Sequence, residues 1–266
     1  MHRTSWRLVA ALLVSAAACR PEFQLKRFTT NETLYSASLR EFQRRKWDNA
    51  VTGFDKLTTE LPARDTLLPR SYWYLASAHE NLGEHLLAAQ SFNRLVETFP
   101  EDSLADDAAL DAARSYRQLW RNPELDPTYG ETALATYNML ISLYPDSPLM
   151  PVANKEIADL NNTFARKDYI SGMYYFRRKA YDSGDIYFKN ILAKWPDSPT
   201  ARDASLRLVE SYRANRYNGD AAELCTELRK KYSGAGDVAK VCRGIPDVPA
   251  RVPADTTRPP AKPPAR

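Results

Sequence analysis

The sequence predicts an all-helical protein made of about five helical hairpins, and three observations support this fold class. Proline ends several apolar stretches, at Phe99-Pro100, Tyr144-Pro145 and Trp195-Pro196, and aspartate follows each proline within two residues. Proline cannot continue a helix, and aspartate is a favoured N-cap residue, whose side chain accepts hydrogen bonds from the first turn of the next helix. Glycine is scarce, with 9 residues, whereas tyrosine is plentiful, with 15. This composition favours packed helices over strands joined by glycine-rich turns.

The third observation is an internal repeat, which is clearest between residues 70 and 100. Apolar residues at helical spacing lie on both sides of a turn at Leu82-Gly83. Ala76 and Ala88 are small enough to let two helices approach closely, and Phe92 fills the space between them. This is the tetratricopeptide pattern of about 34 residues. The chain is therefore predicted to be all-α, a tetratricopeptide-repeat α-solenoid.

The same pattern fits four other segments, with two irregularities. Repeat three contains an insertion of about eight residues within 121–130, where prolines and a glycine indicate a loop. A long helix over 150–167 precedes repeat four, in which Gly184 replaces the expected alanine. We expect repeats 1–3 over residues 31–148, and the long helix with repeats 4–5 over residues 149–234.

The N-terminal segment has the features of an export signal over residues 1–18. A basic start precedes an apolar run, Leu8–Ala18, that is too short to cross a bilayer. The run ends in Ala16-Ala17-Ala18-Cys19, which resembles a bacterial lipobox, although leucine is usual where Ala16 stands. The motif implies cleavage before Cys19 and lipidation of Cys19, followed by a lipid-anchored linker over 19–30. The alternative is ordinary cleavage, with Cys19 incidental.

The other end of the chain, residues 235–266, is predicted to be a proline-rich disordered tail. Seven prolines follow Cys242, with almost no large apolar residues that could offset the entropy of ordering. The formal net charge is +4, but the basic excess lies in the signal and the tail, and the body is close to neutral. A nucleic-acid reader would carry its positive charge on the folded part, so no nucleic-acid partner is expected.

The remaining chemistry-bearing residues predict no enzyme, no metal site and no cofactor. The chain has 3 histidines and shows no glycine-rich phosphate loop, nucleophile elbow or metal-spaced cluster. An oxidising compartment would permit a disulfide between Cys225 and Cys242. Alternatively, Cys225 is a small buried apolar residue of repeat five.

Several short motifs occur in a fixed order over about residues 19–234. They are Leu34-Tyr35-Ser36-Ala37, Trp47-Asp48-Asn49-Ala50, Asp126-Pro127-Thr128-Tyr129, Lys167-Asp168-Tyr169 with Tyr174-Tyr175, and Pro196-Asp197-Ser198 with Thr200-Ala201-Arg202-Asp203-Ala204. In order and spacing this set resembles the five-repeat layout of the BamD/YfiO family of β-barrel assembly lipoproteins. The proline-rich tail is not part of that shared pattern.

The resemblance implies a lipoprotein on the periplasmic face of the outer membrane, held there by its lipid anchor. It implies two kinds of protein partner. The C-terminal repeats would bind the barrel-forming assembly protein (BamA-like), and the N-terminal repeats would receive unfolded outer-membrane proteins. Two other functions stay open, a periplasmic repeat lipoprotein that coordinates cell-wall processes and an accessory domain of a cell-wall enzyme.

A stacked repeat array presents a concave groove lined by the first helix of each hairpin. In repeats one and two this geometry predicts Tyr35, Phe42, Arg70 and Trp73 as client contacts, with Arg70 available to a client carboxylate. The alternative is that the aromatic residues only pack between repeats.

The predicted contacts for the barrel-forming partner lie in the last two repeats. They are Arg202, Asp203, Arg207 and Arg213, which supply the exposed charge there. The alternative for each of them is an ordinary solvated face.

Overall fold

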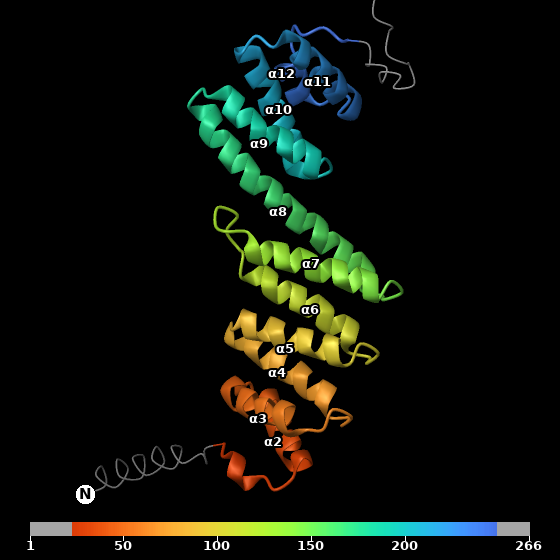
Figure 1. Cartoon of the computed structure of the whole chain (residues 1–266). Helices are drawn as coiled ribbons and strands as arrows, with labels where there is room; N and C mark the ends of the chain where they lie inside the picture. The colour runs from red at the N-terminus through yellow and green to blue at the C-terminus, as the bar shows by residue number, and fades with distance from the viewer. Residues whose placement is uncertain (1–22, 249–266) are drawn as a thin grey trace, which may run out of the picture. The chain divides into compact units, whose positions relative to one another are not determined.

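The computed structural model describes residues 23–248, and this part of the chain is helical throughout (Figure 1). The export signal and Cys19 lie outside the described residues. None of the described helices is both long and apolar enough to cross a membrane. After a short 3-10 helix, Leu25–Arg27, the α-helices are α2 (Asn31–Gln43), α3 (Trp47–Glu60), α4 (Leu68–Leu82), α5 (His85–Thr98), α6 (Ala105–Gln118), α7 (Thr128–Leu143), α8 (Met150–Arg177), α9 (Tyr181–Lys194), α10 (Pro199–Ala214), α11 (Asn218–Lys231) and α12 (Gly236–Val241).

The chain divides into two compact units. Of the described residues, those up to 121 and those of 128–154 form unit 1, and 122–127 with 155–248 form unit 2. Unit 1 therefore contains α2–α7 and the first residues of α8, and unit 2 contains the rest of α8 and α9–α12. Apart from residues 122–127, unit 2 begins at Lys155 inside the long helix, a few residues after position 149 expected from the sequence.

In unit 1 each helix packs on the next one along the chain, from α2 to α7. The interior has the small-and-aromatic pattern that the sequence predicts. Ala76 and Ala88 are fully buried, and Phe54 and Phe92 fill the hairpin interiors. The all-helical fold, built from sequential hairpins, is thus confirmed.

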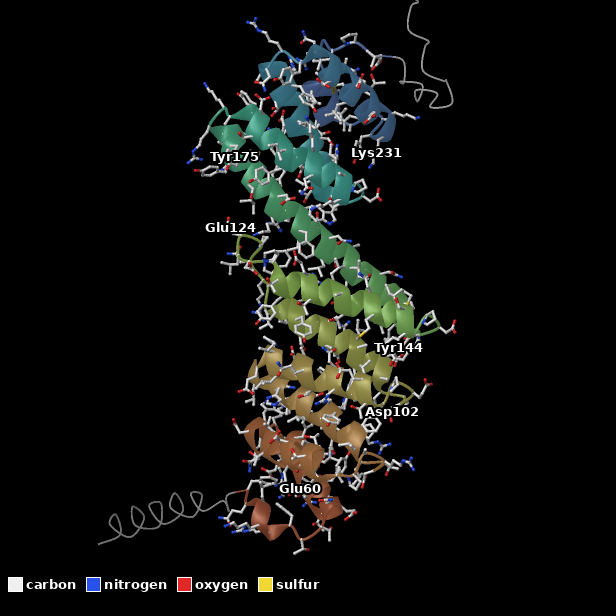
Figure 2. All side chains as sticks on the ribbon, in the orientation of Figure 1. Glu60, Asp102, Glu124, Tyr144, Tyr175 and Lys231 are labelled. Atoms are coloured by element: carbon white, nitrogen blue, oxygen red, sulfur yellow. A yellow bond between two sulfur atoms is a disulfide. The ribbon has the colours of Figure 1, made fainter. Side chains whose placement is uncertain are left out.

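Local signals in the sequence explain where the helices of unit 1 begin and end. The side chains of Thr30 and Thr33 form a reciprocal capping box at the start of α2. Helix α4 ends at Gly83, whose φ of 77° lies in the left-handed region that glycine adopts without strain. The side chain of Tyr144, labelled in Figure 2, lies at the end of repeat three. Its hydroxyl donates a hydrogen bond of 3.0 Å to the carbonyl of Pro100 at the end of repeat two.

The loop that holds the insertion of repeat three covers residues 119–127, so it begins and ends slightly earlier than the sequence suggested. Helix α6 ends at Gln118 and α7 begins at Thr128, so Gly130 is helical and does not belong to the loop. Gly130 is buried against the ring of Trp120, and a Cβ at this position would overlap that ring. Close packing against Trp120 therefore explains Gly130, which the sequence pattern had assigned to a turn.

In unit 2 the predicted long helix is present as α8, an unbroken helix of 28 residues. Helices α8 and α9 pack closely because two glycines face their contact. A Cβ on Gly172 would lie 2.6 Å from the ring of Phe188, and one on Gly184 would lie 3.0 Å from the carbonyl oxygen of Gly172. Close packing thus accounts for Gly184 in place of the expected alanine.

The C-terminal part of unit 2 corrects the predicted boundary of the tail. Residues from 235 were expected to be disordered, but α12 forms there and buries Val238 against the α10–α11 pair. A disulfide joins Cys225 to Cys242, with a Cα–Cα distance of 5.7 Å. Arg229 donates hydrogen bonds of 2.8 Å to the carbonyls of Cys242 and Ile245. The crosslink and these bonds supply the stabilisation that composition alone did not reveal.

Candidate functional site

The aromatic residues predicted for the client groove lie in unit 1 and are half-buried. Tyr35 packs edge-on against Phe54 and Tyr74, with ring centroids 5.7 and 6.4 Å apart. Phe42 lies 5.1 Å from Tyr74 and 5.1 Å from Trp47. We call these five residues the N-terminal aromatic cluster. Tyr35 and Phe42 of repeat one thus pack against Tyr74 of repeat two, which is the packing between repeats that the alternative interpretation described. The client contact stays a prediction.

The other two predicted groove residues occupy different positions on α4. Arg70 is exposed and lies close enough to Tyr35 to affect its hydroxyl. Burial raises the pKa of Tyr35, Tyr74 raises it further, and the positive charge of Arg70 opposes both effects. Trp73 points to the other side, onto Phe92 of its own hairpin, at 5.3 Å. The charge of Arg70 thus acts on the Tyr35 hydroxyl, whereas Trp73 packs on a different neighbour, Phe92.

Sequence reasoning missed Tyr74, which contacts three members of the aromatic cluster. It stands directly after Trp73, and neighbouring helical residues point about 100° apart. The aromatic run Tyr72-Trp73-Tyr74 was the available signal, because three bulky rings in succession must face different neighbours.

Both described histidines are engaged with carboxylates in unit 1. Nδ1 of His79 lies 2.7 Å from Glu84, and Nδ1 of His85 lies 3.0 Å from Glu80. Glu80 also accepts a hydrogen bond of 2.9 Å from the hydroxyl of Ser115. These contacts join the turn of repeat two to α6, and they serve to hold the two repeats together.

The arginines predicted for the partner surface all make contacts within unit 2. Arg202 forms an ion pair of 2.6 Å with Asp237 at the start of α12. Arg213 donates a hydrogen bond of 2.9 Å to the carbonyl of Val241. The two side chains therefore hold α12 against α10.

The third arginine has a different partner. Arg207 pairs with Glu210 at 2.7 Å and donates to the hydroxyl of Tyr169 at 3.4 Å, and these two hydrogen bonds raise its pKa. Asp203 is exposed on the same helix. All four predicted residues thus lie on α10, and their contact with a partner stays a prediction.

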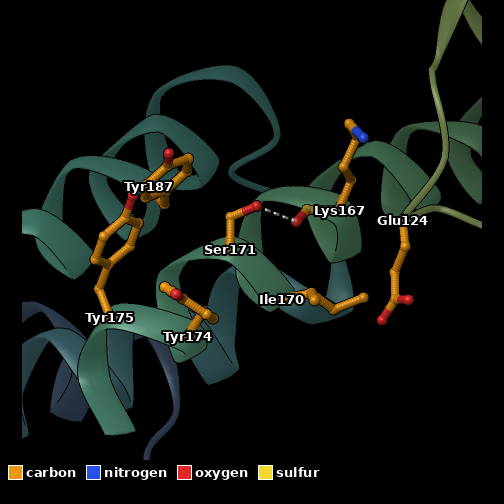
Figure 3. Close-up of a pocket in the computed structure, with 7 residues that line it drawn as sticks. All are labelled: Glu124, Lys167, Ile170, Ser171, Tyr174, Tyr175 and Tyr187. Atoms are coloured by element: carbon orange, nitrogen blue, oxygen red, sulfur yellow. Dashed lines mark hydrogen bonds between the residues drawn. The ribbon is translucent and has the colours of Figure 1, made fainter. Parts of the chain in front are cut away.

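Unit 2 also contains a pocket that the sequence did not reveal, which we call the tyrosine pocket. It has a volume of about 340 Å³ and is lined by Glu124, Lys167, Ile170, Ser171, Tyr174, Tyr175 and Tyr187 (Figure 3). At one end of it the rings of Tyr175 and Tyr187 stack, 5.7 Å apart and nearly parallel. The proximity of Tyr175 is also the main reason that the pKa of Tyr187 is raised.

The insertion loop forms the other end of the tyrosine pocket. The ammonium group of Lys167 on α8 donates hydrogen bonds to the carbonyls of Pro123 and Leu125, at 3.3 and 2.7 Å. These bonds hold Glu124 at the rim. Tyr174 and Tyr175 had been noted in the sequence only as part of a motif, and Tyr187 gave no signal, because its place beside them depends on how α9 packs on α8.

In residues 23–248 no group of three or more histidine, cysteine, aspartate or glutamate side chains is arranged to hold a metal ion.

Comparison with known proteins adds a family and its relatives. The family model described as YfiO, outer membrane lipoprotein, matches residues 28–227. A relative in Caulobacter vibrioides, outer membrane protein assembly factor BamD, is 24% identical over 80% of this chain and 72% of its own length. The protein of the same name in Xylella fastidiosa is 23% identical over 68% of this chain and 65% of its own length. The crystal structure of the P58(IPK) TPR domain is similar with a TM-score of 0.43 and 16% identity, covering 79% of this chain and 54% of that one.

Proposed function

We propose a scaffold function in outer-membrane protein assembly for this chain, which belongs to the YfiO family of outer membrane lipoproteins. The chain is non-catalytic and acts in the β-barrel assembly (Bam) complex, where it binds the barrel-forming assembly protein and unfolded outer-membrane proteins. The observation that carries this proposal is the family match. It spans nearly all of α2–α11 and so includes the five hairpins.

Unit 1 is the proposed client surface. The half-buried edges of Tyr35 and Phe42 offer apolar contact, and their packing against Tyr74 fixes the rings in place. Rings that are already ordered lose little entropy when a ligand binds. The guanidinium of Arg70 is exposed, its charge acts on the Tyr35 hydroxyl, and it can donate two parallel hydrogen bonds to a carboxylate of the client.

Unit 2 is the proposed surface for the barrel-forming protein. Arg207 and Arg213 are held by Glu210, Tyr169 and the carbonyl of Val241, so their charges are presented in fixed positions. Exposed Asp203 on the same helix adds a charge of opposite sign. A mixed charged surface of this kind favours one orientation of a partner over others.

We propose that lipidated Cys19 anchors the chain to the outer membrane, with both units on the periplasmic side. The disulfide between Cys225 and Cys242 supports an oxidising compartment, because such bonds are rare in the reducing cytosol.

Charge reversal at Arg70 tests the client surface without disturbing the core. We expect Arg70→Glu to reduce crosslinked co-purification of unfolded outer-membrane proteins by at least fivefold, with the barrel-forming protein still bound. Arg94→Glu is the matched control, because Arg94 is an exposed arginine of α5 in the same unit. Among the described residues Arg94 forms one ion pair, a 3.7 Å contact with Glu97. Equal client recovery with Arg70→Glu and Arg94→Glu would exclude Arg70 from the client surface. Failure of the chain to co-purify with the barrel-forming protein at all would refute the scaffold function.

A further inference from the structure

We propose that the tyrosine pocket of unit 2 binds the proline-rich end of this same chain, residues 249–266. The proposal does not depend on the barrel-assembly function. It joins two features that the function leaves unused, namely an aromatic pocket and a proline-rich basic segment that begins in the same unit.

The pocket has the chemistry that binds extended proline-rich chains. Such segments dock into grooves lined by aromatic rings, which pack on the proline rings, while tyrosine hydroxyls bond to the free backbone carbonyls. Here three tyrosines and Ile170 line one pocket. Tyr174 is 52% exposed and Ile170 is 37% exposed, although both carry large apolar surfaces. Exposed apolar side chains that gather around a hollow indicate a binding site.

The pocket is also held ready for a ligand. Lys167 fixes the insertion loop through two carbonyls, and the guanidinium of Arg178 lies 3.6 Å from the centre of the Tyr174 ring. The Tyr175 and Tyr187 rings support each other by stacking. A pocket with ordered walls loses little entropy on binding, so a short segment can bind with useful affinity.

The carboxylate at the rim favours this occupant, because Lys167, the cation in the pocket lining, is already bound to two carbonyls of the insertion loop. Glu124 lines one end of the pocket, and no ion pair engages its carboxylate within the described part of the chain. Residues 249–266 contain six prolines and four basic residues, against a single aspartate. A basic residue that flanks the prolines, such as Arg258 or Lys262, can therefore pair with Glu124 when the prolines lie on the tyrosines.

The segment is long enough to reach the pocket. The described chain ends in unit 2, where the amide of Val248 donates a hydrogen bond of 3.1 Å to Thr226 of α11. At 3.1 Å per residue, the 14 residues from 249 to Lys262 span about 43 Å when extended, which leaves Pro263 and Pro264 free to lie on the tyrosines. A compact unit of about 100 residues has a radius of gyration of about 13 Å, hence a diameter of about 35 Å.

The covalent link lowers the affinity that is needed. A segment tethered by a short flexible linker has an effective concentration on the order of 1 mM. A dissociation constant of about 100 μM for the free peptide would therefore keep about nine tenths of the pockets occupied. The chain's own end would then shield the tyrosines from other proline-rich segments.

A peptide titration on the full chain tests the proposal. The acceptor is a full-length variant in which all six prolines of residues 249–266 are replaced by alanine, and the ligand is a synthetic peptide of residues 249–266. We expect binding with a dissociation constant of about 10–100 μM, and at least about tenfold weaker binding to the unmodified chain, whose pocket is occupied by a tethered segment at an effective concentration on the order of 1 mM. Adding Tyr174→Ala or Glu124→Gln to the acceptor should weaken binding at least tenfold and about threefold, respectively.

Tyr129→Ala in the acceptor is the matched control, because Tyr129 is an exposed tyrosine of α7 outside the pocket. It should leave peptide binding unchanged, and the helical circular dichroism of every variant should match that of the acceptor. Equal peptide affinity of the unmodified chain and the acceptor would overturn the proposal. So would equal losses in the Tyr174 and Tyr129 variants. A photo-crosslinker at position 171, where Ser171 lines the pocket and no tyrosine is lost, should attach to residues 249–266 of the same molecule in the otherwise unmodified chain. Attachment only to a second copy would likewise contradict the proposal.

Discussion

Units 1 and 2 are built from the same kind of hairpin but place their aromatic residues differently. In unit 1 the rings of Tyr35 and Phe42 turn toward Phe54 and Tyr74 and become part of the interior. In unit 2 Tyr174 and Tyr187 line an open pocket. The repeat pattern specifies what fills the space between two helices, and it leaves the positions beside that space free to differ.

The two units also differ in how they are held together at their ends. Unit 1 begins with a capping box at Thr30 and relies on aromatic packing. Unit 2 has a disulfide and a short additional helix, α12, which Arg202 and Arg213 attach to α10. We infer that unit 1 depends mainly on its core and unit 2 partly on its crosslink, and the following predictions test this contrast.

The largest expected effect is the loss of a core ring in unit 1. Phe54 is fully buried and contacts both Tyr35 and Tyr74, so Phe54→Ala should lower the free energy of unfolding by about 3–5 kcal/mol. Hydrogen exchange of the α2–α4 amides reports the change in unit 1. Tyr174→Ala, at the exposed ring of unit 2, should cost less than about 1 kcal/mol. Similar costs for the two substitutions would remove the contrast.

The next effect is loss of the crosslink in unit 2. Cys225 and Cys242 are 17 residues apart, and a disulfide that closes a loop of about this length contributes about 3 kcal/mol. Replacing both cysteines with serine should therefore speed hydrogen exchange in α10–α12 and leave α2–α7 unchanged. Unchanged exchange in α10–α12 would show that packing alone holds the end of unit 2.

A smaller effect is expected at the close contact of α8 and α9. Gly172→Ala places a methyl group 2.6 Å from the ring of Phe188, so it should destabilise unit 2 by about 1–3 kcal/mol. Gly219→Ala is the control, since a Cβ there meets nothing within 4 Å and alanine favours a helix. Chemical denaturation of both variants measures the difference. A gain in stability from Gly172→Ala would mean that the helices can separate without cost.

The smallest effect concerns pH, and it should appear in both units. Burial raises the pKa of Asp111 in unit 1 and of Asp185 in unit 2 above the ordinary value of 3.8. The folded state then binds more protons than the unfolded state in the window above pH 3.8, so these groups make stability fall as pH rises through that window. Asp185→Asn should flatten this decrease in unit 2, and Asp111→Asn should do so in unit 1. If stability fell more steeply with rising pH in either variant, the raised pKa of the replaced aspartate would not be the cause of the decrease.

The sequence predicted those features of the fold that depend on local chemistry. Prolines after aromatic residues identified the helix ends, and the spacing of Ala76, Ala88 and Phe92 identified a hairpin. It misplaced Gly130, because a glycine that relieves packing against Trp120 looks like a glycine in a turn. It also began the tail too early, since the contact of Val238 with the α10–α11 pair joins residues distant along the chain.

The candidate site was predictable to a smaller extent. Repeat geometry assigned Tyr35, Arg70 and Trp73 to one groove, but it could not say that Trp73 turns to Phe92 while Tyr74 joins the cluster. The tyrosine pocket was not predictable. It depends on Lys167 binding the carbonyls of a loop some 40 residues earlier in the chain, and no local pattern reports such a contact.

The central claim is that the two units bind different partners, and site-specific photo-crosslinking in native outer membranes tests it most directly. One set of probes replaces Tyr35 or Phe42 in unit 1, and the other replaces Asp203 or Arg213 in unit 2. We predict that the unit 1 probes crosslink to unfolded outer-membrane proteins and the unit 2 probes to the barrel-forming assembly protein. The reverse pattern, or the same products from both sets, would contradict the claim.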